Sequence, residues 1–226
     1  MKNKFTVIHF VSIVFIIVFL DQFLKIYIKT NFFVGQEKLL LGSWLRLHFI
    51  ENPGMAYGLT FGSSQWAKII LSSIRFIAII AGIVIMIRTI KKGWNFFGFI
   101  CWSLVIAGAL GNLIDSMFYG IIFNESGTSL TQKVATFLPP EGGYSTFFLG
   151  NVVDMIYAPM FHGTFPNWSP LWAGEEFEFF SPIFNIADSS ISVGMFMLLI
   201  FMNKLYPQRK KANQPITIEN SESNEI

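Results

Sequence analysis

Two acidic residues, Asp154 and Asp188, lie next to strongly apolar stretches of this chain. Asp188 stands near the start of the last apolar run, within residues 184–188, and Asp154 follows two valines. A carboxylate in a membrane-spanning segment is costly unless it is paired, protonated or facing a polar cavity, so its presence usually marks a functional site. Two carboxylates held close together share one proton, so one can activate water while the other donates to a carbonyl oxygen or a leaving nitrogen. We therefore predict that Asp154 and Asp188 meet at the outer edge of a membrane and hydrolyse a peptide bond there.

The composition is that of a membrane protein. Of 226 residues, 53% are apolar and only 13% are charged, whereas soluble domains have about 25% charged residues. The net charge of +2 is too small to indicate binding to nucleic acid. The single cysteine, Cys101, can form no internal disulfide, and the scattered histidines lack the spacing of metal ligands. We expect neither a metal nor a cofactor.

Four apolar runs are long enough to cross a bilayer. They predict transmembrane helices at residues 5–28, 66–87, 94–118 and 183–203. These helices would place residues 1–205 in a single membrane domain, and the polar tail at 206–226 is expected to be disordered.

The two longer connections, residues 29–65 and 119–182, contain the other predicted elements. Alternating apolar residues at 44–50 predict a short strand, and the Glu-Asn-Pro-Gly sequence at 51–54 predicts the turn that ends it. The β-branched residues around Asp154 predict a second strand. The expected fold class is therefore an all-α membrane protein with four transmembrane helices, a small extracytoplasmic β-sheet cradle and a long outer loop.

The basic residues predict the orientation, because Lys and Arg accumulate on the cytoplasmic side. Most of them flank one end of the predicted spans: Lys2, Lys4, Arg88, Lys91, Lys92, Lys204, Arg209, Lys210 and Lys211. Both termini and the 88–93 connection would then be cytoplasmic. The other end of the spans, and the outer segments, would carry the costly polar groups: Asp21, Lys25, Asn52, Asn112, Asp115, Asp154, Asn185 and Asp188.

Two of these groups allow more than one interpretation. Asp21 and Lys25 are spaced i, i+4, so they could simply neutralise each other and extend outwards, or they could brace a site. Gly108, Asn112 and Asp115 share one helix face, where small and polar residues favour close contact with another helix. Such a structural contact explains Gly108 and Asn112 well, but it explains Asp115 less well unless that residue reaches the membrane interface.

Three functions remain open on the residues alone. Hydrolysis by an aspartic pair fits best, because the chain shows neither a nucleophile with a histidine partner nor a nucleotide-binding motif. A small transporter could use the acidic residues as a proton relay, but that function predicts carboxylates at mid-bilayer depth. A non-catalytic lipid-binding scaffold would use the aspartates only as helix caps.

Five motifs in a fixed order give the chain a specific resemblance to a known family. They are Asp21-Gln22-x-x-Lys25, Asn52-Pro53-Gly54-x-Ala56, Gly111-Asn112-Leu113-Ile114-Asp115, Val153-Asp154 and Phe184-Asn185-x-Ala187-Asp188. In these motifs the chain resembles prolipoprotein signal peptidase, also called lipoprotein signal peptidase or signal peptidase II.

The resemblance implies a four-span aspartic endopeptidase of the bacterial inner membrane, with its active site on the periplasmic side. Such an enzyme removes the signal peptide from prolipoproteins just before the cysteine that carries a diacylglyceryl group. Asp154 and Asp188 would be the catalytic pair, and Asp21 and Lys25 would brace the site. The residues that would shape the pocket and position the substrate are Asn52, Gly54, Asn112, Asp115 and Asn185. Its expected partners are the diacylated prolipoprotein, membrane lipid and globomycin-type inhibitors, and we expect a monomer.

The chain departs from the family pattern in two places. Many members have an arginine directly after the aspartate that matches Asp115, where this chain has Ser116. The separations from Asp115 to Asp154 and from Asp154 to Asp188 are also longer than in the shortest members. The additional outer residues could form a larger substrate lid or a surface for a partner.

Overall fold

The computed structural model describes residues 6–42, 44–53, 65–92, 96–159, 161–179 and 182–205. The predictions for Lys2, Lys4, Gly54 and the tail at 206–226 fall outside these residues.

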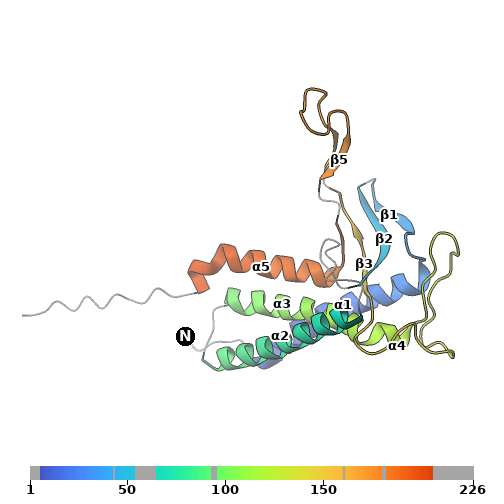
Figure 1. Ribbon diagram of the computed structural model, residues 1–226. Coiled ribbons are helices and arrows are strands. Elements are labelled where there is room, and N and C mark those ends of the chain that lie inside the picture. Colours follow the sequence, from blue (N-terminus) through green and yellow to red (C-terminus); the bar gives the residue numbers. More distant parts are fainter. Residues whose placement is uncertain are drawn as a thin grey trace, which may run out of the picture.

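Long helices form the body of the molecule and lie side by side (Figure 1). These long helices are α1 (Val7–Asn31), α2 (Gln65–Lys92), α3 (Phe96–Ile114) and α5 (Ile186–Leu205). Helix α3 continues directly into the π-helical turn η2 (Asp115–Tyr119) and the short helix α4 (Gly120–Ile122). Among the described residues, three stretches are long and apolar enough to cross a membrane: Val7–Asn31, Gln65–Lys91 and Phe96–Ile122. The fourth predicted span corresponds to α5, whose described apolar part, Ile186–Phe201, is shorter.

The predicted span at 183–203 therefore begins too early. Ile183 and Phe184 form the short strand β6, and the helix starts only at Ile186. An apolar run fits a buried strand as well as a helix, so hydrophobicity alone could not separate the two.

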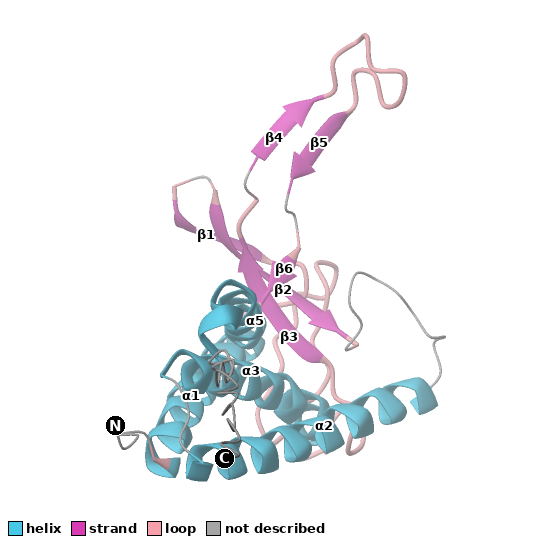
Figure 2. Cartoon of the chain, turned by 90° about the vertical axis from the view of Figure 1, so that its left-hand side faces the viewer, coloured by secondary structure: helices cyan, strands magenta, loops and turns pink. Residues whose placement is uncertain are grey.

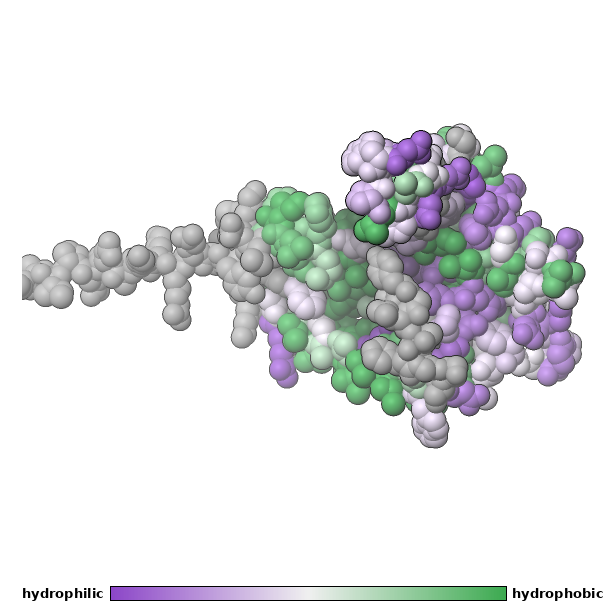
Figure 3. Space-filling model, turned by 45° about the horizontal axis from the view of Figure 1, so that its top comes forward, coloured by the Kyte–Doolittle hydropathy of each residue, from purple (hydrophilic) through white to green (hydrophobic). Residues whose placement is uncertain are grey.

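Apolar side chains cover the outside of the helices, as expected where lipid is the solvent. Phe15, Phe19 and Phe23 of α1 are all exposed. Figure 3 shows hydrophobic surface over the helices and hydrophilic residues gathered at the end that carries the sheet and loops.

Helices α3 and α5 approach most closely at Gly108. A Cβ atom on Gly108 would clash with the carbonyl oxygen of Ala187 and lie 2.7 Å from the Ile191 side chain. The close approach that small residues permit between membrane helices is therefore used here to bring α3 against the start of α5.

A four-stranded antiparallel sheet lies at one end of the helices (Figures 1 and 2). Its strands, in spatial order, are β1 (Glu37–Leu41), β2 (Leu45–Asn52), β3 (Val152–Tyr157) and β6 (Ile183–Phe184). The two predicted strands correspond to β2 and β3. The turn predicted at 51–54 begins too early, because Glu51 and Asn52 still pair with Val153 and Val152.

The long outer loop contains a second, two-stranded sheet. Strands β4 (Phe161–Thr164) and β5 (Glu176–Phe179) form a hairpin that extends away from the helices (Figure 2). This hairpin was not predicted, although the alternation Glu-Phe-Glu-Phe in β5 is typical of a strand.

The π-helical turn η2 attaches the outer segment to the helices. A π turn shifts the i to i+4 hydrogen-bond pattern and often occurs at functional sites. The backbone N–H of Gly150 donates to the Ser116 carbonyl at 2.9 Å, and that of Phe148 donates to the Met117 carbonyl at 3.3 Å. These bonds hold the chain immediately before β3 against the end of α3, and thereby fix the position of Asp154.

Candidate active site

Asp154 is a buried carboxyl on β3, with 2% of its surface exposed. Its Oδ1 accepts a hydrogen bond from Nδ2 of Asn185 at 2.7 Å, and its Oδ2 accepts one from Nδ2 of Asn52 at 3.2 Å. Burial raises the pKa of the Asp154 carboxyl to about 7, and the nearby Asp188 carboxylate also raises it. Asp154 can therefore hold a proton near neutral pH.

Asp188 has different surroundings, at the beginning of α5. Asn185 is the residue before the helix, and its Oδ1 accepts the backbone N–H of Asp188 at 2.8 Å. In return, Oδ2 of Asp188 accepts the backbone N–H of Asn185 at 3.3 Å, which completes a reciprocal capping box. Asp188 is only half-buried, so water can reach it.

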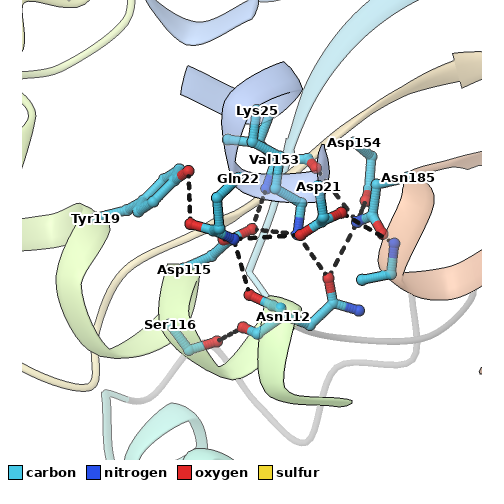
Figure 4. A network of polar contacts seen from close by, with 12 residues as sticks. Asp21, Gln22, Lys25, Asn112, Asp115, Ser116, Tyr119, Val153, Asp154 and Asn185 are labelled. Atoms are coloured by element: carbon cyan, nitrogen blue, oxygen red, sulfur yellow. Dashed lines mark hydrogen bonds and ion pairs between the residues drawn. The ribbon is translucent and has the colours of Figure 1, made fainter. Parts of the chain in front are cut away.

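Two asparagines connect the carboxylates of Asp154 and Asp188. Figure 4 shows Asn185 and Asn112 together with Asp154. The side-chain amide of Asn185 donates to Asp154 and also to Oδ1 of Asn112 at 3.1 Å. The amide of Asn112 in turn donates to Oδ1 of Asp188 at 2.7 Å. The predicted residues Asn52, Asn112, Asn185, Asp154 and Asp188 thus form one hydrogen-bonded unit from four elements.

Lys25 lies behind this unit and is fully buried. Its ammonium group contacts Asp21 at 2.9 Å and Asp115 at 2.8 Å, and it donates to Oδ1 of Asn112 at 2.9 Å. An ammonium group has three donors, and all three have an acceptor here. Lys25 therefore does not extend to the membrane surface, which was one of the two interpretations of the Asp21–Lys25 pair.

The two carboxylates bound to Lys25 each hold the backbone next to an aspartate of the pair. Oδ2 of Asp115 accepts the N–H of Val153 at 3.2 Å, directly before Asp154. Oδ1 of Asp21 accepts the N–H of Ala187 at 2.9 Å, directly before Asp188. Lys25, Asp21 and Asp115 thus form a brace that fixes β3 and α5 relative to each other.

Gln22 and Tyr119 belong to the same network and were not predicted as site residues. The Gln22 amide donates to Asp115 at 2.8 Å and to the Gly111 carbonyl at 3.1 Å, and it accepts from the Tyr119 hydroxyl at 3.1 Å. Tyr119 follows Asp115 by four residues, a spacing that could have placed it on the same helix face.

A second buried polar group lies beside the first and was also missed. Lys29 donates to Glu51 and to Ser126, and Asn151 donates to the other Glu51 oxygen at 2.9 Å. Burial alone would raise the pKa of Glu51, but Lys29 and the Asn151 amide outweigh it and lower that pKa. Because Glu51 precedes Asn52 on β2, this pair supports the strand that reaches Asp154.

Ser116 does not take part in the charged network. Its hydroxyl donates to the Asn112 carbonyl of its own helix at 3.1 Å. The Arg75 side chain on α2 interacts electrostatically with Asp188, so this arginine supplies positive charge near the pair although residue 116 is a serine.

Comparison with known proteins gives a consistent result. The family model for signal peptidase (SPase) II matches residues 13–204. The lipoprotein signal peptidase of Porphyromonas gingivalis is 43% identical over 190 residues, which cover 84% of this chain and 80% of that protein. The lipoprotein signal peptidase of Amoebophilus asiaticus is 33% identical over 213 residues, covering 92% of this chain and 80% of that protein. A solved bacterial membrane enzyme structure is 27% identical, with a TM-score of 0.57 over 90% of this chain and 98% of that one.

Proposed function

Because the chain belongs to the signal peptidase II family, we propose that Asp154 and Asp188 are the two catalytic acids of its reaction. The protein is a membrane aspartic protease that processes prolipoproteins. Its proposed substrate is a prolipoprotein that already carries diacylglycerol, cut just before the lipidated cysteine. One observation carries this proposal: two carboxyls in contrasting environments are joined through Asn185 and Asn112.

The contrast between the environments supports a division of roles. Asp188, which is half-buried and accessible to water, would act as the general base. It would take a proton from a water molecule as the water oxygen bonds to the scissile carbonyl carbon. Asp154, whose pKa is raised by burial, would give its proton to the carbonyl oxygen. When the tetrahedral intermediate collapses, the carbon–nitrogen bond breaks. Asp188 then delivers the proton that it took from water to the leaving nitrogen. The former carbonyl oxygen returns to Asp154 the proton that Asp154 had given it.

The amides around the pair would position the reacting groups. Asn52 and Asn185 hold both oxygens of Asp154, and Asn112 holds one oxygen of Asp188. We propose that Gly54, which follows Asn52 closely, contributes to the same pocket. The brace of Asp21, Lys25 and Asp115 would act through the backbone, by keeping the two catalytic carboxyls at a fixed separation.

The proposed location is the bacterial inner membrane, with α5 as the fourth span of a single domain at 1–205. The excess of basic residues at one end of the spans supports cytoplasmic termini. The site would then lie at the periplasmic end, where a lipid-anchored substrate holds its scissile bond near the headgroups. We propose that the enzyme acts as a monomer and that globomycin-type cyclic peptides inhibit it at this site.

A cleavage assay tests the proposal. Purified protein in detergent is incubated with a diacylated prolipoprotein, and the loss of the signal peptide is followed by gel shift. Asp154→Asn and Asp188→Asn should each reduce the rate by about 10²- to 10⁴-fold, the usual contribution of a general acid or base. Glu125→Gln, which changes an exposed acid outside the site, should cleave like the wild type.

Two outcomes would contradict the proposal. Cleavage at the wild-type rate by either aspartate variant would exclude that residue as a catalytic acid. Equal cleavage of the same precursor without its diacylglyceryl group would overturn the proposed substrate class.

A further inference from the structure

The hairpin formed by β4, β5 and their connecting loop carries an unusual number of exposed aromatic and aliphatic side chains. Trp168 is 82% exposed, Leu171 61% and Trp172 58%, all in the connecting loop. Folded proteins seldom expose such a group of large apolar side chains unless it binds something. An isolated two-stranded hairpin is also only marginally stable in water, so this one needs a surface to pack against.

The aromatic side chains of the hairpin form a continuous surface. The Phe177 ring lies over Gly163, where a Cβ atom would come within 2.7 Å of it. Phe165 packs on Phe177 with ring centroids 4.7 Å apart, and on Trp172 at 5.6 Å. Thr164 and Glu176, which lie opposite each other on β4 and β5 next to the Gly163–Phe177 pair, are polar and exposed. The hairpin is therefore amphipathic, with one aromatic and one polar side.

Its place in the fold indicates what lies against it. The hairpin leaves the body at the level where α5 begins and runs across the direction of the helices (Figures 1 and 2). In both views it reaches beyond the described helices. In a protein whose helices cross the bilayer, this course is parallel to the membrane surface, over lipid rather than over the helix bundle.

The charges of the hairpin limit the kind of contact. Glu175, Glu176 and Glu178 are acidic, and the chain contains neither Lys nor Arg from residue 134 to residue 203. Attraction to anionic headgroups is therefore excluded as the basis for binding. Tryptophan, with its apolar ring and N–H donor, favours the layer between headgroups and acyl chains.

We propose that the β4–β5 hairpin is an interfacial anchor that inserts Trp168, Leu171 and Trp172 into the outer leaflet of the membrane. The hairpin connects β3, which carries Asp154, to β6 and α5, which carries Asp188. Its insertion would therefore hold β3 and α5, the two elements that carry the proposed catalytic residues, at the depth from which a lipidated substrate approaches. This role goes beyond the peptidase reaction.

Site-directed spin labelling tests the proposal on the full-length protein in nanodiscs of zwitterionic lipid. In a Cys101→Ala background, a label at Asn167→Cys reports on the tip of the hairpin without removing its aromatic residues. Labels at Glu125→Cys and Phe196→Cys provide references for water and for lipid, because Glu125 is exposed on an outer loop and Phe196 on α5. The measurement is the collision rate of each label with oxygen and with a water-soluble nickel complex.

The tip label should show several-fold lower access to nickel than the label at residue 125, and oxygen access closer to that at residue 196. Adding Trp168→Ser and Trp172→Ser should raise its nickel access to the aqueous value. An aqueous value at residue 167 with both tryptophans present would overturn the proposal and leave a protein partner as the occupant of this surface. The readout requires no cleavage, so it is independent of the proposed catalytic roles.

Discussion

At the scale of single residues, the main feature of the site is that one kind of side chain occurs in two environments. Asp154 is enclosed by a strand and two asparagine amides, whereas Asp188 lies half-buried at a helix N-terminus. Burial raises the pKa of Asp154, whereas Asp188 is hydrogen-bonded to its N-cap residue Asn185 and lies where water can reach it. Asp154 can therefore hold a proton while Asp188 stays accessible to water.

The raised pKa of Asp154 predicts how stability depends on pH. Its pKa is about 7 in the folded protein against an ordinary value of 3.8. A carboxyl whose pKa rises on folding contributes stability that is fully present below about pH 4 and is lost as the pH rises through about 7. Asp154→Asn should therefore raise the thermal unfolding temperature at pH 8 and change it much less at pH 5. An equal change at both values would contradict the raised pKa, and Glu125→Gln serves as the control.

Asn185 has two roles that substitution can separate. It caps α5 through its Oδ1, and it connects Asp154 with Asn112 through its Nδ2. Asn185→Ala should lose both roles, including about 1 kcal/mol of helix capping. Asn185→Ser should keep most of the capping energy, because serine is a good N-cap, yet lose the amide donor.

We expect both variants to cleave slowly, with Asn185→Ser unfolding at a higher temperature than Asn185→Ala. Thermal unfolding and cleavage rates measured on the same preparations check this. A serine variant that restored cleavage together with stability would show that Asn185 acts only as a helix cap.

At the scale of elements, the site depends on the contact between α3 and α5. Gly108 brings α3 against the Ala187 carbonyl, one residue before Asp188, and the brace then fixes the same region through Asp21. Backbone cannot move aside cheaply, so this contact tolerates little additional volume.

Gly108→Ala should therefore destabilise the protein by about 1–3 kcal/mol and reduce cleavage, because it forces α5 and Asp188 away from Asn112. Gly82→Ala on α2 is the matched control. Its Cβ would lie 3.3 Å from Cδ1 of Ile106, a flexible side chain that can shift. Thermal unfolding and cleavage assays distinguish the two, and wild-type cleavage by Gly108→Ala would contradict the proposed coupling between helix contact and site.

Local sequence patterns predicted the elements better than the contacts between them. Alternation predicted β2, and hydrophobicity predicted the membrane-length helical stretches Val7–Asn31, Gln65–Lys91 and Phe96–Ile122, since both signals come from neighbouring residues. The brace could not be predicted in this way, because Lys25 and Asp115 are far apart in the chain and only the packing of α1 against α3 brings them together. The start of α5 was placed too early because the strand β6 and the helix share one apolar run.

At the scale of the whole molecule, polar and apolar regions are separated along the helix direction. Apolar side chains cover the helices, and hydrophilic residues gather on the surface at the end that carries the sheet (Figure 3). The buried charged network joins α1, α3 and β3. A buried ion pair costs less at the edge of a membrane than at its centre, because water and protein dipoles lie nearby. In the proposed orientation, the molecule would therefore hold this buried network within reach of a substrate in the outer leaflet.

The central claim is that Asp154 and Asp188 act as one catalytic unit. The most direct measurement is the single-turnover cleavage rate of a diacylated prolipoprotein by the wild type, by Asp154→Asn, by Asp188→Asn and by the double variant. Residues that act as a unit give non-additive losses, so the double variant should be about as slow as each single variant. Losses that multiply in the double variant, or a single variant with the wild-type rate, would contradict the claim.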